Sequence, residues 1–254
     1  MRNSLLLLVA LTVTGMVSYG QLRVGPKHSR LIIPERMEFI VDSPTLEVDT
    51  LIMDDHSSLR FTYPDNQIVV HHARIGKDCK WMGNGPLPGI SSSVNYSTNG
   101  ASMDVEIYFS TLGRLTIDLR GAMGLRGSPG VPGARGVDGS MGQADGGNGG
   151  EGGPGGPGGN GGDITFRYKS FDGPIEFGNA KKNAVVIKVD GGSGGAGGAG
   201  GPGGEGGMMT RKILQSPTPV VEVDGRRGSP GRPGIPGPSG SDGEKGRMKL
   251  VEIK

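Results

Sequence analysis

Residues 121–129 read Gly-Ala-Met-Gly-Leu-Arg-Gly-Ser-Pro, and glycine then recurs at every third position as far as Gly142. Nine of the 51 glycines lie before residue 121, so the other 42 fall within the last 134 residues. A share of about one third with a strict period of three is typical of chains that have three residues per turn. This pattern favours a structural extracellular protein over an enzyme.

Four glycine tracts follow this period. The first and last are Gly-X-Y repeats over 121–144 and 225–248, and the two between them are Gly-Gly-X repeats over 146–163 and 191–208. A helix with three residues per turn has no internal hydrogen bonds, so its backbone donors need neighbouring chains or water. We therefore predict polyproline-II or polyglycine-II helical tracts that pack side by side. A Gly-Gly-X tract would bare two faces to its neighbours and a Gly-X-Y tract only one.

Strand-like sequence is expected on both sides of these tracts. Within the glycine-rich region 121–254, we predict interspersed strands in 164–190, 209–224 and 249–254, because apolar residues alternate there. The tracts could then run out, back, out and back within one chain. Such closure favours a monomer, and a collagen-type homotrimer is the alternative.

Residues 1–20 have the form of a secretory signal peptide. Arg2 supplies the positive charge, 5–13 the apolar core, and Ser18-Tyr19-Gly20 the small-residue cleavage site. The apolar stretch is shorter than the about 20 residues that a membrane span requires. Cleavage before Gln21 would lower the formal net charge from +2 to +1, because Arg2 is lost. We expect an extracellular or cell-surface protein with no membrane span and no bulk attraction to nucleic acid.

Residues 37–120 read as a β domain that follows a short leader at 21–36, in which Pro26 and Pro34 interrupt the sequence. Five stretches of the β domain alternate apolar residues with period two. They contain Leu46 and Val48; Leu59, Phe61 and Tyr63; Ile68 and Val70; Val105, Ile107 and Phe109; and Leu115, Ile117 and Leu119. The predicted fold is all-β, either a short β-helix or a β-sandwich, carrying the helical glycine tracts.

The sequence predicts no catalytic, cofactor-binding or metal site. His71 and His72, with the 54–56 stretch Asp-Asp-His, form the one cluster of metal-type ligands. Adjacent residues of a strand face opposite ways, so the two histidines share one ion only if a bulge intervenes. The stretch 158–166 nearly matches a calcium-binding nonapeptide, but Thr165 stands where that repeat needs a large apolar residue.

Three smaller motifs also favour structural roles. Cys79 is the single cysteine, so an internal disulfide is impossible and a buried structural thiol is expected. Asn95-Tyr96-Ser97 is an N-glycosylation sequon that matters only in a eukaryotic source. Arg226, Arg227 and Arg232 form a small basic patch, which we interpret as an aid to solubility.

The block from Gly121 to Gly246, about half of the chain, resembles the collagen-like, glycine-rich secreted proteins of bacteria. In those proteins β segments alternate with Gly-Gly-X and Gly-X-Y tracts. The resemblance implies a non-enzymatic structural or cell-surface protein whose glycine tracts act as a spacer or contact surface. Its partners would be itself or extracellular components. The alternative is an adhesin that recognises a glycan or matrix component through the β-domain loops 83–103, with Trp81 and Tyr96 as candidate contacts.

Overall fold

The computed structural model describes residues 22–83, 99–138, 144–178, 182–213 and 220–254. The predicted signal peptide at 1–20 lies outside these residues. The described backbone forms fifteen strands and no helix. It follows that this part of the chain holds no helix long and apolar enough to span a membrane.

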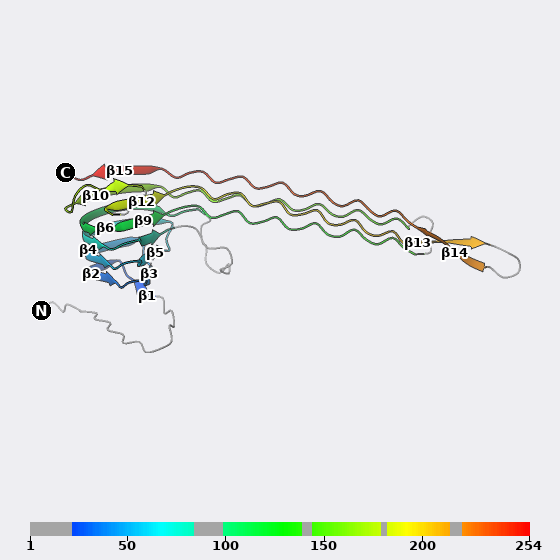
Figure 1. Cartoon of the computed structure of the whole chain (residues 1–254), viewed down its shortest axis with the longest axis horizontal. Helices are drawn as coiled ribbons and strands as arrows, with labels where there is room; N and C mark the ends of the chain where they lie inside the picture. Colours follow the sequence, from blue (N-terminus) through cyan, green and yellow to red (C-terminus); the bar gives the residue numbers. More distant parts are fainter. Residues whose placement is uncertain (1–21, 84–98, 139–143, 179–181, 214–219) are drawn as a thin grey trace, which may run out of the picture.

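Thirteen of the strands form two parallel sheets, between which the chain alternates from β1 to β11 (Figure 1). Sheet A contains, in spatial order, β1 (Leu22–Val24), β3 (Glu38–Val41), β5 (Ser58–Phe61), β7 (Cys79–Met82), β9 (Arg114–Asp118), β12 (Ala184–Lys188) and β11 (Glu176–Phe177). Sheet B contains β15 (Met248–Glu252), β10 (Ile164–Ser170), β8 (Ser102–Leu112), β6 (Asp65–Ile75), β4 (Thr45–Met53) and β2 (Lys27–Ile33). The chain therefore coils as a two-sheet parallel solenoid.

The core of the solenoid lies between the sheets and consists of stacked rows of like residues. In sheet B, Leu46 pairs with Ile68, Ile68 with Val105, and Val105 with Phe166. All four are at most 1% exposed. Burying each side chain of this kind stabilises the fold by about 1.5–3 kcal/mol. Because side chains alternate between the two faces of a strand, the apolar pattern fixes which face turns inward.

The segment 21–36, expected to be a leader, instead contributes strands β1 and β2 to the two sheets. Pro26 and Pro34 flank β2 rather than interrupt it. Proline lacks the backbone donor of a sheet ladder and is tolerated next to a strand, which reconciles the two prolines with this arrangement.

The prediction of polyproline-II or polyglycine-II helical tracts is wrong, because the described residues contain strands and no helix. The glycine tracts run as extended segments outside both sheets. We name their described parts the first (121–138), second (144–163), third (189–207) and fourth (228–247) glycine segments. The period of three suggested a helical repeat. In the structure it marks the residues at which one segment hydrogen-bonds to another.

The glycine segments continue the two sheets. Strands β9 and β12 pair with an offset of 70 residues, as Arg114 with Ala184, and beyond them the Gly121 amide donates to the Asp190 carbonyl. Strands β10 and β15 pair with an offset of 84, as Ile164 with Met248. The second and fourth segments, which precede those strands, keep the same offset. The solenoid therefore sets the axial register of the segments.

At the far end, a two-stranded antiparallel hairpin joins the third and fourth segments (Figure 1). It consists of β13 (Met208–Ile213) and β14 (Val220–Arg227). The segments run out, back, out and back, as the hydrogen-bond directions require. The molecule is thus a solenoid with a long four-segment bundle projecting from one end.

Candidate functional site

Five rows of backbone hydrogen bonds hold the four glycine segments together. The first segment donates six bonds to the third, and the second donates six to the fourth; both pairs are parallel. Three antiparallel rows complete the bundle, with five bonds from the second to the first, six from the third to the second and seven from the fourth to the third. Each row uses one residue per triplet, so a single set of equivalent positions repeats along the bundle.

The number of glycines per triplet rises with the number of neighbouring segments. The second and third segments are Gly-Gly-X, and each contacts all three of the others. The first and fourth are Gly-X-Y, and each contacts only the second and third. The two Gly-Gly-X segments therefore occupy the centre of the bundle and the two Gly-X-Y segments its edges.

Close backbone approach explains why these positions are glycine. A Cβ on Gly194 would collide with the Gly240 carbonyl of the fourth segment, and one on Gly195 with the Leu125 carbonyl of the first. The third residue of the same triplet, Ala196, is exposed. Two faces of the third segment thus exclude side chains, and one accepts them.

Side chains of the second segment complete the pairing with the fourth. Asp145, Asn148, Asn160 and Asp163 each accept a hydrogen bond through Oδ1 from the amide 84 residues later, at 2.7–2.9 Å. Those donors are the X-position amides of Ser229, Arg232, Glu244 and Arg247. The same offset places Pro154 beside Pro238, which has no amide hydrogen to satisfy. The two segments are therefore complementary in sequence as well as in backbone.

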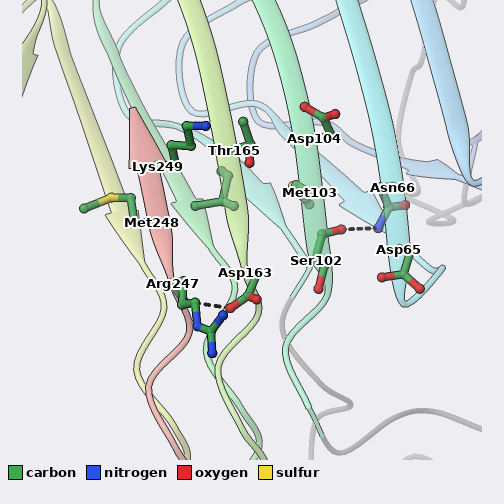
Figure 2. A pocket seen from close by; sticks show the side chains of 11 residues that line it. Asp65, Asn66, Ser102, Met103, Asp104, Asp163, Thr165, Arg247, Met248 and Lys249 are labelled. Atoms are coloured by element: carbon green, nitrogen blue, oxygen red, sulfur yellow. Dashed lines mark hydrogen bonds between the residues drawn. The ribbon is translucent and has the colours of Figure 1, made fainter. Parts of the chain in front are cut away.

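A groove of about 440 Å³ lies on sheet B where the solenoid meets the bundle (Figure 2). It crosses β6, β8, β10 and β15 near their first residues. The strand register aligns Asp65 with Ser102 in one row and Asp104 with Thr165 and Lys249 in another. Parallel pairing thus gathers polar groups that lie far apart in the sequence.

Charge is distributed unevenly along this groove. Asp104 forms an ion pair with Arg167 at 2.6 Å, and Asp163 accepts the Arg247 amide at 2.7 Å. Within the described part of the chain, the side chains of Asp65, Arg247 and Lys249 have no ion-pair partner. Three strand spacings, about 14 Å, separate the strand that carries the free carboxylate from the strand at which the free cations lie.

One buried polar atom at the groove also lacks a partner. Asn66 lines the groove, is 5% exposed, and donates through Nδ2 to the Tyr63 carbonyl at 2.8 Å. Its Oδ1 accepts no hydrogen bond. An unsatisfied buried acceptor is uncommon in a folded protein and marks a place where a donor from a ligand or water would be stabilised.

Of the two candidate adhesin contacts, Trp81 lies within the described residues and does not reach the surface. Trp81 is fully buried, with its ring edge-on to Phe61 at 5.9 Å and its Nε1 donating to the Met53 sulfur at 3.3 Å. It belongs to the core. Tyr96 and most of the 83–103 stretch lie outside the described residues.

The metal-type residues are not all brought together. The register of β6 shifts between Val70 and Ala73, so His71 and His72 both reach the exposed face of sheet B. The 54–56 stretch instead lies in the turn after β4. The described residues contain no group of three His, Cys, Asp or Glu positioned to hold a metal ion. In the stretch 158–166, the Asn160 and Asp163 side chains accept backbone amides of the fourth segment.

Cys79 is a buried thiol in β7. Its Sγ lies 3.2 Å from the Asp54 carbonyl oxygen and 3.7 Å from the Ser57 hydroxyl. Burial raises the pKa of the thiol, which keeps it protonated and unreactive at neutral pH. Of the arginines considered as a patch, Arg227 and Arg232 are exposed.

No local motif in the sequence predicts the groove. Its residues come from four strands that are separated by tens of residues and by the four glycine segments. No protein-family model, curated protein or solved structure matches this chain.

Proposed function

We propose that this chain is a secreted, non-enzymatic structural or cell-surface protein, in which the glycine bundle is a spacer that holds its terminal hairpin away from the solenoid. The observation that carries the proposal is the set of five hydrogen-bond rows, which joins four segments into one rod. The signal-peptide pattern of residues 1–20 supports export.

The spacer role follows from the dimensions and stiffness of the bundle. An extended tract of 18 residues, such as 191–208, spans at most about 65 Å. A single glycine-rich chain of that length would be a flexible coil. Cross-linking each segment to two or three others at every triplet removes that freedom, so the separation between the hairpin and the solenoid is fixed.

Export and shape can be tested on the same material. Protein recovered outside the expressing cells should begin at Gln21 by intact mass, allowing for cyclisation of the terminal glutamine. X-ray scattering from it should give an elongated particle, and light scattering should give the mass of one chain. Retention of Met1 would contradict export, and a compact globular profile would contradict the spacer.

A second candidate function is a binding module, and the groove on sheet B favours it. Arg247 and Lys249 offer two cations without ion-pair partners among the described residues, while Ser102, Thr165 and Asp65 offer hydroxyl and carboxylate groups. This combination fits a short acidic oligosaccharide, with its carboxylate on the cations and its hydroxyls along the strands.

The binding candidate is tested by titrating the protein with acidic and neutral oligosaccharides of equal length. We expect the acidic series alone to bind, and the variant Arg247→Gln/Lys249→Gln to bind at least tenfold more weakly. Lys188→Gln, an exposed lysine of sheet A, is the matched control and should bind like the parent. Equal affinity of parent and double variant would exclude the groove as the site.

A further inference from the structure

The first and fourth segments form the two outer edges of the bundle. The first and fourth segments make no backbone hydrogen bond to each other. In each of them, the X and Y side chains face solvent. Several X residues are large, apolar and exposed: Leu125 is 75% exposed, Val131 71% and Ile235 63%. Neither burial nor solubility accounts for apolar side chains at these positions.

The central segments show what a glycine face without side chains would do on an edge segment. In the third segment, Gly194 admits the fourth segment and Gly195 admits the first. In the first segment, the single glycine of each triplet already serves two neighbours, since a Cβ on Gly124 would collide with Gly156 of the second segment and approach Gly195 of the third. A second glycine per triplet is thus what distinguishes a segment with three neighbours from one with two.

We infer that the X side chains of the edge segments block a docking surface. Without them, a glycine segment from a second copy of this chain would bind there. The first segment has no glycine at any of its six X positions, which are Ala122, Leu125, Ser128, Val131, Ala134 and Val137. The Cβ atoms, rather than the nature of the side chains, keep a fifth backbone out. This explains why Ala, Ser, Leu and Val all occur at these positions.

The block by the X side chains explains why the bundle stops at four segments. A backbone face that is bare and unpaired is a template for lateral growth, as an open sheet edge is. In this bundle the X side chains cover the outermost faces. Proline does not occupy every position, and the side chains do not share one charge. The inference rests on the bundle geometry alone, and it holds whether or not the protein is exported.

The test removes the Cβ atoms from one edge while an alanine set keeps them. We expect the variant L125G/S128G/V131G/A134G to associate, its mass in light scattering rising at least twofold with concentration. The matched variant L125A/S128A/V131A, in which Ala134 is already alanine, should keep the mass of the parent. Association of both variants would show that loss of the larger side chains, and not of the Cβ atoms, is responsible.

A folded glycine variant that keeps the mass of the parent at all concentrations would overturn the inference. Folding is checked by slow exchange of the Gly153 and Gly156 amides, which donate to the Ser128 and Leu125 carbonyls at 2.7 Å. If the fourfold variant does not fold, the pair S241G/E244G and S241A/E244A makes the same comparison on the fourth segment. There the Asn160 side chain bonds the Glu244 backbone, which both substitutions leave intact.

Discussion

Gly194, Gly195 and Ala196 form one triplet of the third segment and face three different surroundings. The first two would place a Cβ on carbonyl oxygens of the fourth and first segments, while Ala196 is exposed. We expect Gly194→Val and Gly195→Val each to destabilise the protein by about 3 kcal/mol, because neighbouring backbone must move. Ala196→Val should change stability by less than about 0.5 kcal/mol.

Thermal unfolding of the three valine variants measures this difference. A loss of about 3 kcal/mol corresponds to a fall in Tm of roughly 6–12 °C for a chain of this size. Equal melting of all three variants and the parent would mean that the third segment is a solvated linker.

Asp118, the last residue of β9, forms an ion pair with Arg120 just before the first segment, with Nη2–Oδ2 at 2.7 Å. Burial acts to raise the pKa of Asp118, but hydrogen bonds from the Arg120 guanidinium and amide, with its positive charge, lower it below the ordinary 3.8. A carboxyl group whose pKa is lower in the folded state stabilises the protein at pH values above its unfolded pKa. That stabilisation is lost as the pH falls through the folded pKa. The pair should therefore contribute at neutral pH and not in strong acid.

We expect Asp118→Asn to lower the free energy of unfolding by about 0.5–1 kcal/mol at pH 7, a small value because Arg120 is half exposed. Urea unfolding of parent and variant should converge as the pH falls below about 4. Asp172→Asn, an exposed residue, serves as the control and should leave stability unchanged. A variant deficit that persists at pH 2.5 would show that packing, not charge, is responsible.

Among whole elements, the second and fourth segments offer a test of side-chain pairing. Asn148 and Asn160 accept the amides of Arg232 and Glu244 at 2.9 and 2.8 Å. Replacing either asparagine by leucine should speed hydrogen exchange of its own partner amide at least tenfold and leave the other amide unchanged. Glu151→Leu, on the exposed third position of the same segment, is the control and should affect neither.

The strands of the solenoid were predictable from sequence, but their partners were not. The alternating residues at 46–48, 68–70, 105–109 and 115–119 all place their apolar members in the core. Alternation reports which face is buried and says nothing about whether the neighbouring strand is parallel. A β-helix and a β-sandwich therefore stayed equally compatible. Tyr63, which continues the alternation of β5, is 39% exposed because the strand has ended at Phe61.

The glycine tracts and the groove show two further limits of sequence reasoning. Glycine periodicity predicted close contact between tracts, but the same period was wrongly interpreted as a helix. The groove depends on register, since Asp65, Ser102, Asp163 and Arg247 become neighbours only when four distant strands pair. No local signal in the sequence carries that information.

For the whole molecule, the bundle should tolerate shortening only when all four segments change together. Deleting 127–129, 153–155, 196–198 and 237–239 removes one triplet from each segment and one bond from each row, and it leaves the remaining bonds in register. The remaining Asn and Asp pairs keep their partners as well. We expect a folded protein whose longest dimension is smaller by about 10 Å, measured by X-ray scattering.

Deleting 153–155 alone is the matched control. It shifts half of the second segment by one triplet against three neighbours while the solenoid holds the other half in place. That variant should unfold at a much lower temperature than the fourfold deletion. If the single deletion is tolerated equally well, the rows do not act as a unit.

The position of the hairpin at the end of an out-and-back bundle has a mechanical consequence. A pull between the hairpin and the solenoid runs along the segments, across the direction of the hydrogen bonds that join them. The bonds of each row are then strained in shear and share the force, whereas peeling would break them one at a time. Tension applied at the tip is thus delivered to the solenoid by a stiff, inextensible strut.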